Sequence, residues 1–224
     1  MIAVLIAGGL FLAPRSNDRF YQLGYTPSAS FKKIAVIFTG VGQQTTNLEY
    51  TKIGRYYLSK GITPIYVDID WRRVGLNHLS ETADQLGAVI CTSFPHSKVY
   101  LFGFSFGAVM AYKVSERIAS EQALLCSMSP VFDEDRKLQQ FPFKQLLGLI
   151  TNDSKQKLTF AHSRSKGIIL LYGEHDSFLI NPRMIYFRKN SIANNVSVIV
   201  KDAHHDVSGG SYLRAIKTYV EAIE

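Results

Sequence analysis

One serine lies in a local pattern that suits nucleophilic chemistry. The run at positions 99–102 is apolar and aromatic or β-branched, and the pattern beyond position 107 is helical. Between the two lie Gly103, Phe104, Ser105, Phe106 and Gly107. A serine in a sharp strand-to-helix turn is pushed out at the carboxyl edge of a sheet, where its hydroxyl can attack an acyl carbon. Glycine at both ends fits such a turn, because crowded backbone leaves no room for a Cβ atom.

Acid and base candidates follow two later apolar runs. Directly after the run at 168–172 come Gly173, Glu174, His175 and Asp176, and after the run at 196–200 come Asp202, His204, His205 and Asp206. A serine hydroxyl is a weak nucleophile until a neighbouring imidazole takes its proton. The imidazole in turn needs a carboxylate that holds its tautomer and stabilises its charged form. The order along the chain is therefore serine, acid and histidine.

These candidates share a position relative to the predicted secondary structure. Helical segments alternate with short apolar runs, which we interpret as buried strands at 34–38, 62–67, 99–102, 123–128, 167–172 and 196–200. This alternation predicts an α/β fold, with a doubly wound, mostly parallel sheet and helices on both of its faces. In such sheets the functional residues lie on loops that follow the carboxyl ends of strands. The serine, the acids and the histidines all have this position.

A metal site is the competing interpretation of the later cluster. His175, His204, His205 and Asp206 carry side chains that are good metal ligands. That interpretation leaves the serine pattern unexplained, and the chain lacks a helical His-x-x-x-His pair. We therefore expect no metal and no cofactor.

The two cysteines do not suggest a functional site. Cys91 and Cys126 lie in apolar segments and have no Cys or His at metal-binding spacing. We interpret both as ordinary buried thiols and leave open whether they pair as a disulfide.

The composition is that of a globular protein with room for a substantial core. The chain has 224 residues, of which 46% are hydrophobic and 19% charged. The formal net charge is +7, but Lys and Arg are scattered and form no basic run interleaved with aromatic residues. We therefore expect a solvated basic surface and no nucleic-acid partner. The sequence does not indicate an oligomeric state.

The apolar segment at residues 1–13 allows two interpretations. It is too short to span a bilayer comfortably, since a spanning helix needs about 20 residues. Its length suits the apolar region of a secretory signal, although a positively charged leader and a clear cleavage site are missing. The alternative is a first strand packed on the domain. The first interpretation implies export or membrane association and the second a cytoplasmic protein, so localisation stays open.

From residue 33 to residue 224 the chain resembles serine hydrolases of the α/β-hydrolase fold superfamily. The pentapeptide around Ser105 is similar to their nucleophile elbow and is the most specific part of the resemblance. The loop at 173–176 is similar to their Gly-x-x-Asp acid loop, which favours Asp176 over Glu174. The loop at 203–205 is similar to their Ala-x-His loop, which favours His205 over His204. The resemblance thus implies a catalytic triad of Ser105, Asp176 and His205.

The resemblance also implies an oxyanion hole made of two backbone N–H groups. One belongs to Phe106, directly after the nucleophile, and the other to Val41 in the loop at 39–42. Members of the superfamily often carry His-Gly in this loop, where this chain has Thr39 and Gly40. Because the expected donor is backbone, the difference need not remove it.

The reaction implied by the resemblance is the hydrolysis of a small carboxylic ester or thioester. Residues 131–165 lie where the superfamily often inserts a cap, and their short length favours a minimal lid and short-to-medium acyl chains. The expected organisation is an N-terminal segment and loop at 1–32 followed by a hydrolase domain at 33–224. Two alternatives remain. One is a thioesterase or acyltransferase for CoA- or carrier-linked acyl groups, and the other is a non-catalytic binding protein with the same fold.

Overall fold

The computed structural model describes residues 31–74, 76–131, 162–189 and 195–224, without the side chains at 182, 183, 186 and 187. At 2–6, 9–13 and 21–25 it describes the backbone as strands.

A parallel sheet forms the centre of the fold. Its six strands lie in the order β5-β4-β6-β7-β8-β9 and are all parallel to their neighbours. Their bounds are β4 Lys33–Phe38, β5 Thr63–Ile69, β6 Lys98–Phe104, β7 Gln122–Cys126, β8 Ile168–Gly173 and β9 Asn195–Val200. The strands predicted from the apolar runs are confirmed. In β4 to β8 the continuous hydrophobicity follows from burial on both faces of a parallel sheet, whereas in the edge strand β9 only Val200 is buried.

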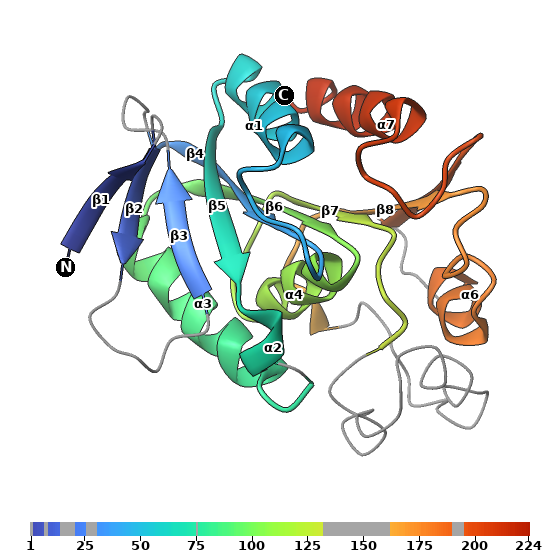
Figure 1. Ribbon diagram of the computed structural model, residues 1–224, viewed down its shortest axis with the longest axis horizontal. Coiled ribbons are helices and arrows are strands. Elements are labelled where there is room, and N and C mark those ends of the chain that lie inside the picture. Colours follow the sequence, from blue (N-terminus) through green and yellow to red (C-terminus); the bar gives the residue numbers. More distant parts are fainter. Residues whose placement is uncertain are drawn as a thin grey trace.

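Helices cover both faces of this sheet, as Figure 1 shows. On one face α1 (Leu48–Ser59) and α7 (Gly210–Glu221) pack together, and on the other α3 (Leu79–Ser93) packs against α4 (Phe106–Ser115). Two shorter helices, α2 (Trp71–Val74) and α6 (Pro182–Lys189), pack on the same face of the sheet as α3 and α4. Successive side chains of β4 alternate between the two layers, with Val36 in the α3–α4 layer and Ile37 in the α1–α7 layer.

Three antiparallel strands extend the sheet beyond β5. They are β1 (Ile2–Ile6), β2 (Gly9–Ala13) and β3 (Tyr21–Tyr25), drawn in blue at one edge in Figure 1. The register of β3 pairs Tyr21 with Ile69 and Tyr25 with Ile65. The sequence predicted a loop in the region of β3. Its Tyr-Gln-Leu-Gly-Tyr pattern does alternate, but a five-residue stretch between polar segments becomes a strand only through pairing with β5.

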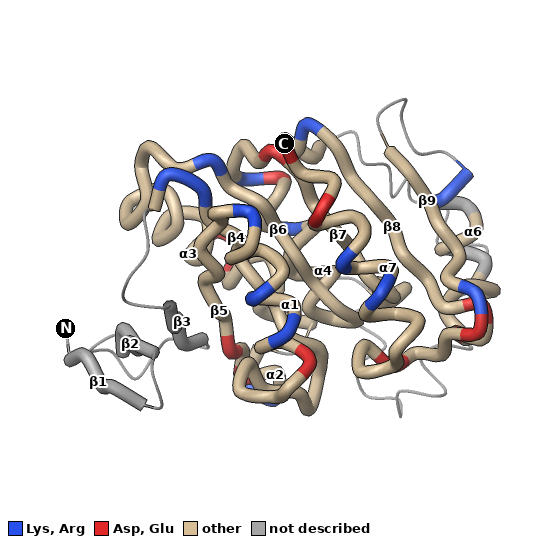
Figure 2. The backbone as a smooth tube through the Cα atoms, turned by 90° about the horizontal axis from the view of Figure 1, so that it is seen from above, with Lys and Arg blue, Asp and Glu red and all other residues tan. Residues whose placement is uncertain are grey.

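The charged residues do not gather on one element of the described chain. Figure 2 shows Lys and Arg distributed over helices, strands and loops, with Asp and Glu among them. Among the described residues, no helix is long and apolar enough to cross a bilayer. The cap predicted at 131–165 lies, for residues 132–161, outside the described residues.

Both cysteines are free thiols, and only one of them is buried. Cys126 ends β7 and is fully buried, which raises the pKa of its thiol. Cys91 is exposed, so its interpretation as a buried thiol was wrong. Its neighbour Ile90 faces the core. Successive residues of an α-helix are rotated by about 100°, so the Cys91 side chain lies on the outer face of α3.

We expect Gly107→Ala to destabilise the fold, because α4 begins very close to the end of β4. A Cβ atom at Gly107 would lie 2.5 Å from the carbonyl oxygens of both Phe38 and Thr39. Backbone cannot move aside as a flexible side chain can, so the unfolding free energy should fall by about 1–3 kcal/mol, as in other overpacked sites. Urea unfolding measures this loss.

Gly210→Ala is the matched control for that experiment. A Cβ atom at Gly210 would meet only the Arg214 side chain, at 3.5 Å, so stability should be retained. A Gly107→Ala protein as stable as wild type would contradict the close approach.

Candidate active site

Ser105 occupies a strained backbone position between β6 and α4. Its φ of 57° and ψ of −120° are rare for a residue with a side chain and typically store about 1–3 kcal/mol of strain. Hydrogen bonds hold the turn in place. The Ser105 N–H donates to the Cys126 carbonyl over 2.9 Å, and the Ser129 N–H donates to the Ser105 carbonyl over 3.3 Å. The neighbouring strand β7 therefore fixes the direction in which the serine side chain leaves the sheet.

The structure brings Ser105, His205 and Asp176 into one chain of hydrogen bonds. The His205 Nε2 atom lies 3.1 Å from the Ser105 Oγ atom, and its Nδ1 atom lies 3.0 Å from Asp176 Oδ2. An ionised carboxylate only accepts hydrogen bonds, so we assign the ring proton to Nδ1. The Nε2 lone pair then accepts the hydroxyl proton of Ser105. This is the arrangement that a histidine needs to act as a base toward the serine.

The Asp176 carboxylate is buried but well supplied with hydrogen-bond donors. Burial by itself raises the pKa of this group. The hydrogen bond and charge of His205, a hydrogen bond from the Ser127 side chain and one from the Phe178 N–H outweigh it, so the pKa lies below its ordinary value. The Phe178 N–H reaches Oδ1 over 2.8 Å. Asp176 is therefore ionised at neutral pH and can stabilise a positive charge on His205.

Aromatic rings hold the His205 imidazole on two sides. Its centroid lies 5.0 Å from the Phe104 ring and 4.5 Å from the Phe178 ring, the latter edge-on. The rings limit the orientations open to the imidazole, while about a third of the His205 side chain, 32%, remains exposed. The histidine is thus fixed and still accessible from solvent.

Backbone pairing between the loops after β8 and β9 carries the acid and the histidine together. The Glu174 N–H donates to the Val200 carbonyl and the His175 N–H to the Ala203 carbonyl, both over 2.9 Å. Gly173 permits this approach, because a Cβ atom there would lie 2.5 Å from the Ala203 carbonyl oxygen. The backbone hydrogen bonds between β8 and β9 thus continue into the two loops that carry Asp176 and His205.

The loop after β4 bonds the backbone N–H of Gly40 but not that of Val41. The Gly40 N–H donates to Gln43 Oε1 and to the Tyr50 hydroxyl, each over 3.2 Å, and these two side chains also bond each other. Burial raises the pKa of Tyr50, which keeps its hydroxyl protonated. The next N–H, that of Val41, has no hydrogen-bond partner among the described residues, and Val41 is 56% exposed. The sequence pointed to Val41 but not to Gln43 and Tyr50, because no motif marks those two residues.

Phe106, the other predicted oxyanion donor, is the first residue of α4. The first backbone N–H groups of a helix have no acceptor within the helix, and they lie at the positive end of the helix dipole. The Phe106 ring packs edge-on against Trp71, with 5.8 Å between their centroids.

The remaining candidates surround the site without joining the hydrogen-bonded chain. His204 stacks on His175 at a tilt, with ring centroids 4.9 Å apart. Asp206 accepts hydrogen bonds from the Ser208 N–H and hydroxyl, each over 2.8 Å. The four residues of the metal-binding interpretation, His175, His204, His205 and Asp206, therefore have different partners and do not form one group of ligands.

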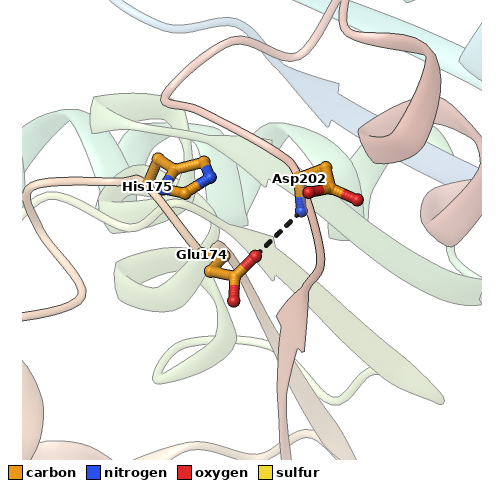
Figure 3. A group of neighbouring side chains, drawn as sticks. All are labelled: Glu174, His175 and Asp202. Carbon is orange, nitrogen blue, oxygen red and sulfur yellow. Dashed lines mark hydrogen bonds between the residues drawn. The ribbon is translucent and has the colours of Figure 1, made fainter.

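Within the described part of the chain, the side chains close enough to share a metal ion are instead those of Glu174, His175 and Asp202. All three are exposed. Figure 3 shows the Glu174 carboxylate turned toward the backbone of Asp202. Glu174 already accepts a hydrogen bond from the Asp202 N–H over 3.1 Å, which supports Asp202 at its φ of 55°. This hydrogen bond is a further contact between the loops after β8 and β9.

The lowered pKa of Asp176 predicts a pH-dependent contribution to stability. A carboxyl group whose pKa is depressed on folding stabilises the native state fully above its unfolded pKa, near 3.8, and loses this effect as the pH falls through the folded value. The difference in unfolding free energy between wild type and Asp176→Asn should therefore be largest near neutral pH and shrink below about pH 4. Urea unfolding at a series of pH values measures it.

Thr82→Val provides a control for this prediction, because Thr82 is buried and does not titrate. Its difference from wild type should be the same at every pH. An Asp176→Asn difference that is equally constant would show that the carboxylate is not held in its charged form.

Comparison by sequence finds no relative: no family model matches the chain, and no curated protein matches it.

Comparison of structures does find similar proteins over almost the whole chain. An α/β serine hydrolase homologue from Coxiella burnetii is 15% identical, with 97% of each chain covered and a TM-score of 0.64. A serine hydrolase without a lid from Xanthomonas campestris is 13% identical, with 97% of this chain and 94% of that chain covered and a TM-score of 0.63. Est1E from Butyrivibrio proteoclasticus is 11% identical, with 96% and 98% covered and a TM-score of 0.63. Together with the parallel sheet and the turn at Ser105, this likeness confirms the predicted fold: the chain has the α/β-hydrolase fold.

Proposed function

We propose that this protein is a serine hydrolase that cleaves carboxylic esters or thioesters through an acyl-enzyme on Ser105. The hydrogen-bonded chain from Asp176 through His205 to Ser105 is the observation that carries the proposal. The names of similar structures, serine hydrolases among them, support the same class of reaction. The strain at Ser105 adds support, because such backbone conformations cluster at functional sites.

In the first half of the reaction, His205 Nε2 takes the proton from the Ser105 hydroxyl as Oγ bonds to the substrate's acyl carbon. The carbonyl oxygen gains the negative charge, and His205 becomes an imidazolium that the buried Asp176 carboxylate stabilises. His205 then returns the proton to the departing alcohol or thiol. The carbon–oxygen or carbon–sulfur bond breaks, and the acyl group remains on Ser105.

In the second half, His205 takes a proton from a water molecule that attacks the acyl-enzyme. The same proton then passes to Ser105 Oγ as the carboxylic acid leaves, which restores the starting protein. The exposure of part of the His205 side chain is consistent with entry of water at this step.

In each half of the reaction, the carbonyl oxygen of the attacked acyl group becomes negatively charged. The N–H groups of Val41 and Phe106 would stabilise this charge. The unpartnered N–H of Val41 supports this assignment, because the preceding N–H is already bonded to Gln43 and Tyr50. The position of Phe106 at the start of α4 supports the second donor. Each such donor is typically worth about 10²–10³ in rate.

Covalent labelling by a fluorophosphonate tests the nucleophile directly. Wild type should be labelled and Ser105→Ala should not, because the probe reacts with a serine hydroxyl activated by its histidine. Ser59→Ala, at an exposed serine of α1, is the matched control and should be labelled like wild type. Equal labelling of Ser105→Ala would exclude Ser105 as nucleophile. Absence of labelling in wild type would favour the non-catalytic binding protein.

A panel of p-nitrophenyl esters and acyl-CoA thioesters tests the substrate class. We expect hydrolysis of short-to-medium acyl esters, and a loss of roughly 10³-fold or more in kcat for Ser105→Ala. The paired rings of Phe106, the residue that follows Ser105, and Trp71 would contact the acyl group. Hydrolysis of acyl-CoA without hydrolysis of simple esters would select the thioesterase or acyltransferase alternative. Activity confined to long, bulky chains would contradict the proposed chain length.

A further inference from the structure

The loop after β4 is packed against the turn that carries Ser105. A Cβ atom at Gly40 would lie 3.3 Å from both the carbonyl oxygen and the ring of Phe104, the residue before the serine. On the other side of the turn, a Cβ atom at Gly107 would lie 2.5 Å from the Thr39 carbonyl oxygen. The start of the loop therefore lies beside the serine, and the direction of its next N–H depends on how the loop continues.

Gln43 closes this loop into a tight turn. Its N–H donates to the Gly40 carbonyl over 3.2 Å, which is the hydrogen bond of a four-residue β-turn. Gly42, at the third position of the turn, has a φ of 76°, which a type II turn needs and glycine adopts readily. The Gly40 carbonyl and the Val41 N–H belong to one trans peptide and point in opposite directions. The bond that draws the carbonyl into the turn therefore directs the Val41 N–H out of it.

The side chains of Gln43 and Tyr50 hold the other end of the same residue. The Gly40 N–H donates to Gln43 Oε1 and to the Tyr50 hydroxyl, each over 3.2 Å, and the Tyr50 hydroxyl donates to Gln43 Oε1. The amide oxygen has two lone pairs for these two donors. A reversed amide would place its NH₂ group against the Gly40 N–H, where two donors cannot bond. The three groups therefore have one consistent arrangement, in which both the N–H and the carbonyl of Gly40 are fixed.

Both sides of the loop are anchored to secondary structure. Tyr50 lies in the first turn of α1 and is fully buried in the same core layer as Ile37 of β4. Burial raises the pKa of Tyr50, so its hydroxyl keeps the proton that it donates. Beyond the turn, the Thr45 N–H and hydroxyl donate to the two carboxylate oxygens of Asp68 in β5, over 2.8 and 2.7 Å. Val41 thus lies between two fixed points of the loop.

We propose that Gln43 and Tyr50 are positioning residues, which hold the Val41 N–H where it receives the negative charge of the attacked carbonyl oxygen. They act through the peptide groups of Gly40 and need no contact with substrate. This role rests on the proposed hydrolase function.

Conservative variants remove the two side-chain groups separately. Gln43→Met keeps the length of the side chain and lacks the amide oxygen, and Tyr50→Phe keeps the ring and lacks the hydroxyl. Gln44→Met, at the exposed neighbour of Gln43, is one matched control. Tyr57→Phe, in the same helix as Tyr50, is the other. The Tyr57 hydroxyl is buried and has no hydrogen-bond partner among the described residues, so its removal leaves the loop unchanged.

Ester hydrolysis is the first measurement. In Gln43→Met kcat should fall about tenfold with KM unchanged, because the displaced N–H faces a charge that is absent from the bound substrate. Removing a whole donor typically costs about 10²–10³ in rate, and a donor that is held less well costs part of that. Tyr50→Phe should lower kcat by less, since Gln43 Oε1 still accepts the Gly40 N–H. Both controls should keep the kcat of wild type.

Inhibition by a trifluoromethyl ketone separates this effect from a general structural one. Ser105 Oγ adds to the ketone carbon, the hydroxyl proton passes to His205, and the ketone oxygen becomes negative as in the reaction. The affinity for this inhibitor should therefore fall by the same factor as kcat in each variant.

Amide hydrogen exchange followed by NMR tests the loop without any substrate. The Gly40 N–H should be protected in wild type and in both controls. It should exchange faster in Gln43→Met and in Tyr50→Phe, and fastest in the double variant, because each single variant leaves this N–H one acceptor.

Each outcome decides the proposal. Unchanged kcat in both Gln43→Met and Tyr50→Phe would overturn it, whether or not the exchange of Gly40 changes. A fall in kcat without a matching fall in ketone affinity would also overturn it, since it would indicate only a structural role. If wild type hydrolyses no ester or thioester, the proposed function fails, and hydrogen exchange still shows separately whether Gln43 and Tyr50 hold the Gly40 N–H.

Discussion

The negative charge of Asp176 is the constraint on which the site depends. A carboxylate with its side chain fully buried is stable only when donors surround it, and here they come from His205, Phe178 and Ser127. Each donor has a consequence for geometry. The bond to His205 sets the imidazole tautomer, and the bond to Phe178 folds the loop after β8 back on itself.

The fold supplies these donors through ordinary sheet geometry. In a parallel sheet all carboxyl ends lie at the same edge, so residues separated by 100 positions, such as Ser105 and His205, can meet there. The strands are held by buried apolar side chains on both faces, with no polar group of the site needed for their pairing. The strands therefore pair through apolar contacts outside the site, whereas the turn at Ser105 and the buried charge of Asp176 contribute both to the folded structure and to the candidate site.

The features that sequence analysis predicted are those that local pattern determines. Continuous apolar runs identified the parallel strands, because burial on both faces leaves a signal within each strand. The acid and histidine loops could be located because they follow such runs. Strand β3 could not, since its polar surroundings hide a pairing with β5 that only the folded chain reveals. Gln43 and Tyr50 were missed for a different reason: their contacts with each other and with Gly40 are local, but no motif marks side chains that bond a loop N–H.

The extended ladder between the loops after β8 and β9 has a consequence for how the site responds to substrate. Backbone bonds from Glu174 and His175 to the opposite loop, and the contact of Glu174 with Asp202, tie the two segments into one body. In the proposed hydrolysis, Asp176 and His205 would therefore already be aligned when substrate binds. Such preorganisation lowers the reorganisation that the transition state requires and leaves induced fit to other parts of the molecule.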